Sequence, residues 1–369
     1  MIRILFFIEN LTEGGAEKVL RNLVNHMDQT KFDITVQTVW PCDASKYLVS
    51  GIRYKSMYSS KNRINQLRYR AEAASGLAYT IHIRDDYDIE CAYLEMGATK
   101  IMASSTNKKA KKLAWVHVDL TKAVKDAHAY AEKAAPWYEK FNQVICVSQN
   151  VKERFDELYN NRFDSKVLYN VIDDDAIREK SLLPLTAGCQ KKRFTVLSVG
   201  RFSPQKRFMR LLQAHKRLLD EGIDHDIWLL GDGAERPMLE KYVSDNDLQG
   251  SVWMPGFIEN PYPFMREADL LACSSIYEGF STFMTEGVIL GKPIVATDVS
   301  GMRELFGNSE YGLIVQDDDE AFYRGLKRMI TEPCCREQYA KAASLRSRDF
   351  CGDVLTKKTE RYFEELIAK

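Results

Sequence analysis

Two glutamates, Glu278 and Glu286, bracket the predicted start of a helix with seven residues between them. Glu278 lies in a turn, and Glu286 lies in the second turn of a helix that we predict from Thr282 to Leu290 with Ser281 as its N-cap. The free N–H groups at a helix start attract an anion. A phosphate there, with carboxylates beside it that accept hydroxyl hydrogens, would bind a sugar nucleotide. The alternative is that both glutamates are solvated surface charges.

The flanking sequence predicts the elements that position these groups. The apolar run ADLLACSS (268–275) and the run PIVAT (293–297) are typical of buried parallel strands on either side of the helix. In an open α/β sheet, ligands bind outside the carboxyl ends of such strands. Another predicted strand is followed by Arg201 and Lys206 in a loop, where charge-assisted hydrogen bonds to phosphate are worth about 1.5–3 kcal/mol each. Two such cations would stabilise a departing nucleoside diphosphate.

The stretch EGFSTFMTE (278–286), followed by GKPIVAT and SGMREL, resembles the signature of the retaining nucleotide-sugar glycosyltransferases of family 4, in the branch that builds bacterial cell-surface glycans. The resemblance implies an α/β protein with the GT-B fold, in which two doubly wound Rossmann-like domains face each other across a cleft. It assigns Glu278 to the sugar hydroxyls, Glu286 to the ribose, and Arg201 and Lys206 to the diphosphate. Arg207 stands where the family usually has glycine, and it either adds a third cation near the phosphates or points outward.

The N-terminal half matches two further motifs of this family. In GGAEKVLRNL, the resemblance implies that Gly14 and Gly15 approach the donor diphosphate, although a glycine pair alone is more typical of an ordinary turn. His117 ends a predicted strand and would contact the donor sugar, with a weaker case for Asp119; a lone histidine at a strand end is more often structural. The other donor-binding positions that the resemblance implies are Gly233, Phe257, Ile258, Phe280, Ser281 and Thr282.

The length of 369 residues predicts two domains. We expect an acceptor-binding domain at 1–174, a linker at 175–191 and a nucleotide-sugar-binding domain at 192–350. The last segment, 351–369, is amphipathic and, by resemblance, crosses back to the N-terminal domain.

The composition excludes some classes of function. The formal net charge is zero, which argues against nucleic-acid binding. The eight cysteines have no C-x-x-C spacing and indicate reduced thiols. No D-x-D follows an apolar strand in a context typical of metal binding, since Asp173–Asp175 and Asp317–Asp319 lie in a predicted linker or turn. We expect neither a metal nor another cofactor. The first apolar run is too short for a signal peptide or a membrane span, and we expect a cytoplasmic protein, with any membrane contact at the inner face of the cell membrane.

Two stretches, 52–84 and 100–125, are rich in lysine and arginine and nearly free of acids. They form either a solvated face or a surface that docks on anionic lipid or on a lipid-diphosphate acceptor. In the second case, Leu77, Tyr79 and Ile81 are the side chains expected to enter the membrane interface.

These observations predict a retaining glycosyltransferase that moves a sugar from a nucleoside-diphosphate donor to a glycan or polyprenyl-diphosphate-linked saccharide. A UDP-sugar is the first expectation and a GDP-sugar the second. Two alternatives remain open: a catalytically inactive GT-B partner or scaffold subunit, and a GT-B epimerase that acts on the nucleotide sugar without an acceptor.

Overall fold

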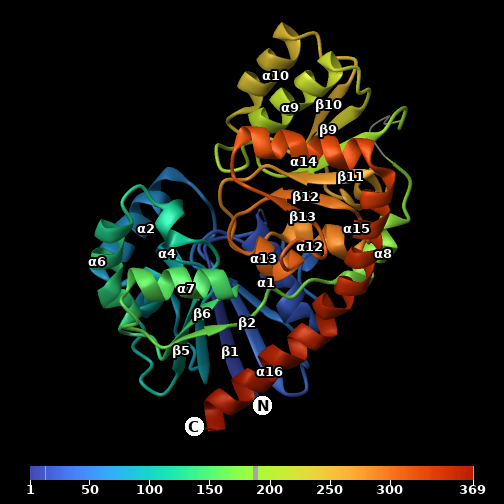
Figure 1. The fold of residues 1–369 in the computed structure, drawn as a ribbon. Helices are drawn as coiled ribbons and strands as arrows, with labels where there is room; N and C mark the ends of the chain where they lie inside the picture. The colour runs from blue at the N-terminus through green and yellow to red at the C-terminus, as the bar shows by residue number, and fades with distance from the viewer. Residues whose placement is uncertain (13, 186–189, 369) are drawn as a thin grey trace. The chain divides into compact units, whose positions relative to one another are not determined.

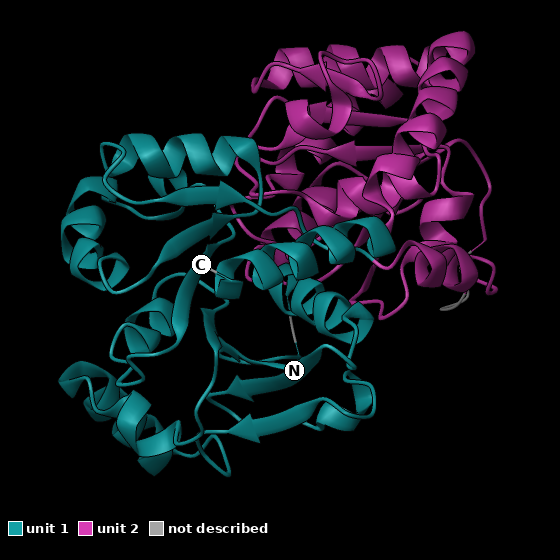
Figure 2. Ribbon diagram, turned by 90° about the horizontal axis from the view of Figure 1, so that it is seen from below, with its two compact units in different colours: residues 1–172, 352–369 teal, residues 173–351 magenta. Residues whose placement is uncertain are grey.

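The structure of the chain is a computed structural model that describes residues 1–12, 14–185 and 190–368 (Figure 1). The chain forms two compact units. The first contains residues 1–172 and the C-terminal helix α16 (Gly352–Ala368), and the second contains residues 173–351 (Figure 2).

The first unit is built on a seven-stranded, fully parallel sheet in the order β3-β2-β1-β4-β5-β6-β7. Its central strands are apolar along their length because helices cover both faces of such a sheet. In β1, for example, the five residues from Ile4 to Ile8 are fully buried. The strands are β1 (Ile2–Ile8), β2 (Phe32–Thr38), β3 (Arg53–Ser56), β4 (Ile89–Ala92), β5 (Lys111–Val116), β6 (Gln143–Cys146) and β7 (Ser165–Val167).

The helices of this unit cover the sheet, and α16 packs on it from the far end of the sequence. Phe363 of α16 lies 6.2 Å from Phe6 and 6.3 Å from Phe32, measured between ring centroids. Glu360 accepts a hydrogen bond of 2.6 Å from the backbone N–H of Asp28. The other helices are α1 (Gly15–His26), α2 (Arg63–Ser75), α3 (Ala78–His82), α4 (Gly97–Met102), α5 (Leu120–Ala123), α6 (Ala127–Tyr138), α7 (Gln149–Leu158) and the short 3₁₀ helix η1 (Ala44–Lys46).

The second unit has a six-stranded parallel sheet in the order β10-β9-β8-β11-β12-β13. Both units are therefore doubly wound Rossmann-like domains, as the sequence predicts. The strands are β8 (Thr195–Val199), β9 (Asp226–Leu230), β10 (Val252–Gly256), β11 (Leu270–Cys273), β12 (Ile294–Thr297) and β13 (Leu313–Val315).

Part of the predicted linker at 175–191 is helical. Helix α8 (Asp174–Ser181) contacts α11 and α12 and belongs to the second unit, while 186–189 lie outside the described residues. The acidic start DDD caps this helix, since the Asp173 side chain accepts from the Ala176 N–H. The other helices are α9 (Phe208–Asp220), α10 (Arg236–Asp245), α11 (Tyr262–Glu267), α12 (Thr282–Ile289), α13 (Met302–Phe306), α14 (Asp319–Thr331), α15 (Pro333–Arg346) and the 3₁₀ helix η2 (Ser347–Phe350).

The strand order gives each sheet one point at which the chain reverses its direction of winding. In the second unit this switch point lies between β8 and β11, and in the first it lies between β1 and β4. The loops that leave the carboxyl ends of these strands diverge there and form the ligand-binding crevice of an open α/β sheet. The loops after β8 and β11, and those after β1 and β4, are therefore where site residues are expected.

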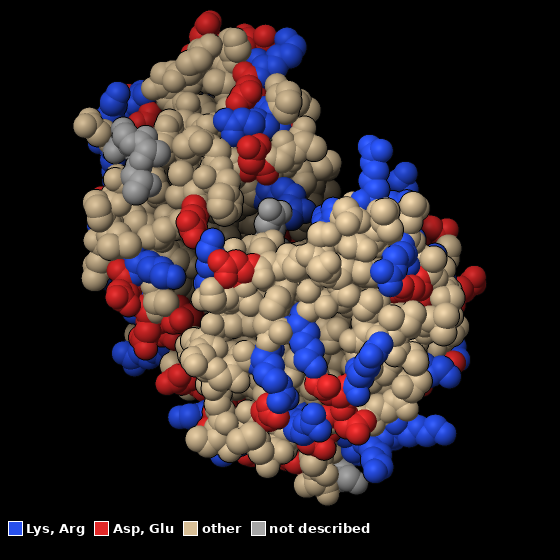
Figure 3. Space-filling model, turned by 180° about the vertical axis from the view of Figure 1, so that it is seen from behind, with Lys and Arg blue, Asp and Glu red and all other residues tan. Residues whose placement is uncertain are grey.

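The distribution of charged side chains on the surface agrees with the net charge of zero. On the face shown in Figure 3, Lys and Arg side chains are interspersed with Asp and Glu. None of the described helices is both long and apolar enough to cross a membrane.

Candidate active site

Lys206 and Glu278 form an ion pair at the switch point of the second unit. Lys206 lies in the loop after β8, and its Nζ is 2.7 Å from Oε1 of Glu278, which lies in the loop after β11. The hydroxyl of Ser275 donates to the same carboxylate oxygen at 2.6 Å. Both charged side chains are largely buried, with 19% of Lys206 and 8% of Glu278 exposed. Burial lowers the pKa of Lys206, but the charge of Glu278, a contribution from Cys273 and the hydrogen bond to Glu278 together raise that pKa overall. Lys206 therefore keeps its proton.

Backbone contacts join the two loops. The hydroxyl of Ser274 donates to the carbonyl of Lys206 at 2.8 Å. The N–H of Ile276 donates to the carbonyl of Gln205 at 2.9 Å, and the side-chain amide of Gln205 donates to the carbonyl of Tyr277 at 2.9 Å. Each loop thus fixes the other, and the ion pair is preorganised.

Glycines let a third loop approach the first. A Cβ at Gly231 would lie 1.9 Å from the carbonyl oxygen of Gly200, and one at Gly233 would lie 2.4 Å from that of Phe202. Both glycines have positive φ, at 138° and 158°. The predicted site residue Gly233 therefore supports the Lys206 loop through backbone packing.

Glu286 is a buried acid in the second turn of α12. Only 4% of it is exposed, and its Oε1 accepts from the hydroxyl of Tyr262 at 3.4 Å. The sequence did not single out Tyr262, although the aromatic–proline run NPYPF was a visible signal. Ser281 occupies the N-cap position, but its side chain makes no capping hydrogen bond within the described chain, so the prediction that it caps the helix is right in position only.

The structure settles where Arg207 points. Arg207 has φ of 48°, the left-handed conformation that favours glycine, and its guanidinium lies 3.2 Å from Asp319. It is thus engaged by the start of α14 rather than free to act as a third phosphate cation. Arg201 is exposed and has no hydrogen-bond or ion-pair partner among the residues that the structure describes.

The remaining predicted positions of the second unit differ in exposure. Phe257 is 77% exposed after β10, and the neighbouring Ile258 is half-buried. Phe280 is buried, with its ring 5.8 Å from that of Phe350. Thr282 is the first residue of α12 and is partly exposed.

In the first unit, His117 and Glu95 meet at the carboxyl ends of neighbouring strands. The backbone N–H of His117, just after β5, donates to Oε2 of Glu95 at 3.0 Å. The His117 Nε2 atom is buried and has no hydrogen-bond partner among the described residues. Burial lowers the pKa of His117 to about 4, so its ring is neutral. Burial raises the pKa of Glu95, and the nearby Glu17 adds to the effect.

The sequence did not predict a role for Glu95, since a single acid after the run ECAYL carries no motif. The other predicted residues of the first unit lie in loops beside β1 and β5. Gly14 has φ of 107°, and a Cβ there would lie 2.3 Å from the Glu17 carboxylate; Gly15 begins α1. Asp119 caps α5 by accepting from the N–H of Thr121 at 3.0 Å, which indicates a structural role.

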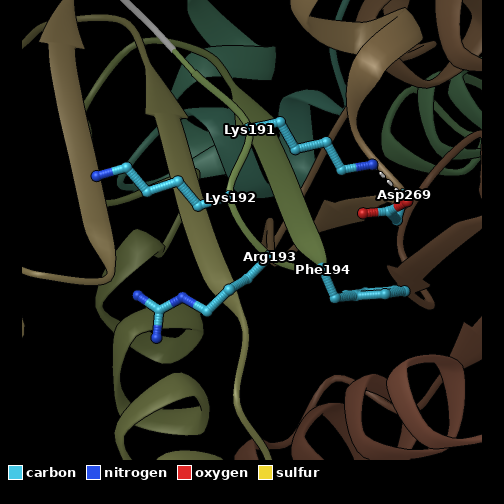
Figure 4. A pocket seen from close by; sticks show the side chains of 5 residues that line it. All are labelled: Lys191, Lys192, Arg193, Phe194 and Asp269. Carbon is cyan, nitrogen blue, oxygen red and sulfur yellow. Dashed lines mark hydrogen bonds and ion pairs between the residues drawn. The ribbon is translucent and has the colours of Figure 1, made fainter.

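A hollow on the second unit lies elsewhere. It is lined by Lys191 to Phe194 and by Asp269, which precede β8 and β11 (Figure 4). It is therefore at the amino ends of the strands, opposite to the Lys206–Glu278 pair. Lys191 points to Asp269, and their side chains form an ion pair of 2.7 Å, so these two charges already compensate each other. Within the described chain, no group of three or more His, Cys, Asp or Glu side chains has the geometry to hold a metal ion.

Comparison with known sequences finds similarity mainly in the second unit. Residues 186–346 match the family model described as "Glycosyl transferases group 1". The chain is 35% identical over 187 residues to N-acetylgalactosamine-N,N'-diacetylbacillosaminyl-diphospho-undecaprenol 4-alpha-N-acetylgalactosaminyltransferase of Campylobacter jejuni, a match that covers 50% of this chain and 49% of that protein. It is 22% identical to the amylovoran biosynthesis glycosyltransferase AmsD of Erwinia amylovora over 97% of this chain and 98% of that protein. In the first three curated relatives, the match spans only 49–58% of their length.

Comparison with solved structures concerns the fold. The crystal structure of Anabaena HepE in complex with UDP and glucose has a TM-score of 0.76 and 17% identity, and the match covers 99% of this chain and all of that one. At this identity the likeness shows that the chain has the GT-B type of fold.

Proposed function

Because residues 186–346 belong to the glycosyl transferases group 1, we propose that this chain transfers a sugar from a nucleoside-diphosphate donor to a saccharide acceptor. The observation that carries the proposal is the buried Lys206–Glu278 pair at the carboxyl ends of β8 and β11. In such a pair, the lysine can bind a phosphate and the neighbouring carboxylate can accept hydrogen bonds from sugar hydroxyls. A purely structural ion pair has no need to lie in this crevice.

The donor we propose is a UDP-sugar. The structural neighbour from Anabaena contains UDP and glucose, and the same fold recurs here over nearly the whole chain. In this assignment Lys206 and Arg201 bind the diphosphate with the first N–H groups of α12, at Ser281 and Thr282. Glu286 accepts from the ribose hydroxyls, and Phe257 and Ile258 lie against the base. Glu278 accepts from hydroxyls of the sugar.

The acceptor we propose is a glycan or a saccharide on a polyprenyl diphosphate. Support comes from the relative in Campylobacter jejuni, whose name includes a diphospho-undecaprenol substrate. Such an acceptor would place the enzyme at the inner face of the cell membrane. The buried His117 Nε2, which has no partner among the described residues, and Glu95, whose pKa burial raises, suit hydroxyl groups better than charged ones.

We further propose that transfer retains the anomeric configuration and needs no metal. The bond from the anomeric carbon to the diphosphate oxygen breaks, and the acceptor oxygen bonds to that carbon on the same face. The acceptor proton passes to the leaving diphosphate, whose added charge Lys206 and Arg201 neutralise. Because these cations do the work of a metal ion, chelation by EDTA is expected to leave the rate unchanged.

The test is to incubate the purified protein with a panel of nucleotide sugars and to measure nucleoside-diphosphate release with and without saccharide acceptors. Acceptor-dependent release that Lys206→Ala abolishes supports the proposal. Conversion of the donor to an isomer without acceptor would instead make the protein an epimerase. Binding of a donor without any turnover over a wide acceptor panel would make it an inactive partner subunit.

A further inference from the structure

Helix α2 (Arg63–Ser75) is unusual in that, although the structure describes all thirteen of its residues, it buries none of them. A helix on a globular protein normally holds its place by burying an apolar stripe. The two large aliphatic residues of α2 do the opposite, since Ile64 is 71% and Leu67 is 65% exposed.

The polar side of α2 faces the protein. Glu72 accepts from the hydroxyl of Tyr58 at 2.5 Å and forms a contact of 2.7 Å with the ring of His82. Tyr69, on the same side, donates to Glu9 at 3.3 Å. Tyr69 and Ala73 on this side also pack against the hydrophobic core of the first unit. The helix is therefore held by hydrogen bonds together with this packing, and the side that carries Glu72 faces inward.

The apolar side of α2 faces outward. The spacing of Ile64, Leu67, Ala71 and Ala74 places these four residues on one helix face. Leu77, which is 54% exposed, lies two residues after the end of the helix. We refer to Ile64, Leu67, Ala71, Ala74 and Leu77 as the α2 stripe. An outward apolar stripe on a hydrogen-bonded helix indicates a surface made for a partner.

Exposed cations flank the α2 stripe. At 100° per residue, Arg63 and Arg70 lie on one side of the stripe and Arg68 on the other, and all three are exposed. Lys61 is also exposed, just before the helix. The single acid of the helix, Glu72, is turned inward, with 13% of its side chain exposed. The outward face therefore combines apolar and positive groups without a negative one.

We propose that α2 docks on the surface of a bilayer that contains anionic lipids. Ile64, Leu67 and Leu77 would enter the boundary between headgroups and acyl chains, while Arg63 and Arg70 bind lipid phosphates. The inference adds a membrane-binding element to the proposed transfer, but it stands on the geometry of α2 and needs neither donor nor acceptor.

The structure also corrects the expected set of inserting residues. Tyr79 is only 2% exposed, and its hydroxyl donates to the buried Glu90 at 2.6 Å, so it cannot reach a membrane. The residues at 64 and 67 take its place.

Charge argues against a second copy of the chain as the partner. In a two-fold dimer through the α2 stripe, the arginines that flank the stripe would face their own copies across a desolvated surface, where like charges repel. A bilayer with negative headgroups complements both the apolar and the positive parts of this face.

The experiment is sedimentation of the full chain with vesicles of phosphatidylcholine, either pure or with about 30% phosphatidylglycerol. The second composition imitates a leaflet that contains anionic lipids. We expect binding to the anionic vesicles only. Ile64→Ser with Leu67→Ser, and separately Arg63→Gln with Arg70→Gln, should each weaken that binding by about tenfold or more. The matched control is Leu345→Ser, at a residue of the second unit that is 62% exposed, which should bind as the parent does.

Equal binding of the parent and both double variants would overturn the proposal, as would no binding of the parent to anionic vesicles. A parent that dimerises in light scattering, with the dimer lost in Ile64→Ser/Leu67→Ser, would assign the α2 stripe to self-association instead. Donor binding, measured without lipid, separates these outcomes from a failure of the proposed transferase activity, because no variant touches the Lys206–Glu278 pair.

Discussion

Two buried glutamates, one in each unit, differ in how the protein accommodates their charge. Glu278 follows β11 and is paired with Lys206 at 2.7 Å. Glu95 follows β4 and receives the backbone N–H of His117, but no cation among the described residues pairs with it. Burial consequently raises the pKa of Glu95, whereas in the second unit the neighbouring Glu278 raises the pKa of Lys206 despite its burial.

This difference indicates a division of labour. A preformed pair of charges in a desolvated crevice can exchange partners with a charged phosphate at little cost in reorganisation. An acid whose pKa burial raises and a neutral imidazole in a buried site suit the uncharged hydroxyls of a saccharide. We therefore expect the second unit to handle the donor diphosphate and the first unit to orient the acceptor or the sugar.

The largest effect is expected from breaking the pair. Glu278→Gln or Lys206→Met should each lower the transfer rate by about 10²–10³-fold, because a group that stabilises the transition state is lost. Each single variant should also lower the free energy of unfolding by about 3 kcal/mol, since one charge stays buried without its partner. The measurements are initial rates at saturating donor and urea unfolding.

The double variant Lys206→Met/Glu278→Gln separates the two effects. Without either charge it should recover most of the stability, yet remain as inactive as the single variants. A control is Lys241→Ala, at a solvent-exposed pair with Asp245, which should change neither quantity. Recovery of activity in the double variant would show that the pair is structural and that the donor site lies elsewhere.

The second effect concerns Glu95. Glu95→Gln should lower transfer by about tenfold to a hundredfold, mainly through a higher acceptor KM, because a hydrogen bond of the carboxyl group is altered. The Glu95→Gln variant should gain stability at neutral pH, whereas Glu278→Gln should lose it. A raised pKa in the folded state makes the parent lose stability as pH rises above the unfolded pKa and through the folded one, and Glu95→Gln should remove that loss.

The matched control is Glu90→Gln, at a buried glutamate within β4 that bonds to the hydroxyls of Tyr79 and Ser105. That variant should lose stability without a change in acceptor KM. If Glu95→Gln instead behaves like Glu90→Gln, the Glu95 carboxyl is part of the core and the proposed division between the units is wrong.

The sequence singled out both Lys206 and Glu278 but not Glu95, and there is a physical reason for this difference. The groups around Glu278 follow apolar strands in loops with local turn and helix-start signals, and these signals are short-range. Glu95 has meaning only because β4 and β5 are neighbours in the sheet, which brings the His117 N–H to its carboxylate over 22 residues of sequence. No local pattern encodes that contact.

Two further differences arise from tertiary contacts. The pattern of Ile64 and Leu67 would ordinarily predict the inward face of α2. Instead, the hydrogen bonds of Glu72 and the packing of Tyr69 and Ala73 on the core hold the opposite face inward. The outward orientation of Arg207 depends on Asp319, more than a hundred residues later. The two doubly wound sheets, by contrast, were predictable because each buried strand is a continuous apolar run.

A smaller effect is expected from the support of the paired site. Gly231→Ala should cost more than about 2 kcal/mol of stability, because the new Cβ would lie 1.9 Å from the Gly200 carbonyl oxygen and φ is 138°. The shifted loop should also reduce transfer severalfold through Lys206. Gly250→Ala is the control, since no atom lies within 4 Å of its Cβ, and it should stay within about 0.5 kcal/mol of the parent. Equal stability of the two variants would mean that the loop adapts and is not preorganised.

The smallest effect tests whether burial without a counter-charge shifts the pKa of a histidine toward its neutral form, as it shifts that of Glu95. In the second unit, the ring of His215 bonds to that of His225 at 2.9 Å and to the Ser251 hydroxyl at 2.8 Å, and both rings are fully buried. Burial, with a contribution from His225, lowers the pKa of His215 to about 3. The unfolded chain therefore takes up a proton near pH 6.5 that the folded chain refuses, and stability falls as the pH drops below 6.5.

His215→Gln keeps a donor and an acceptor at this position but cannot be protonated, so its melting temperature should fall less steeply between pH 7 and pH 4.5 than that of the parent. His117 in the first unit, whose pKa burial lowers to about 4, contributes in the same direction and stays unchanged in this variant. A residual acid dependence is therefore expected, and adding His117→Asn should reduce it further. His225, whose pKa burial also lowers, still contributes in the same direction. If the melting temperature of His215→Gln depends on pH as steeply as that of the parent, the His215–His225 pair is charged or open to solvent in solution. The second unit would then accommodate buried charge through partners, as at Glu278, and not through loss of a proton from histidine.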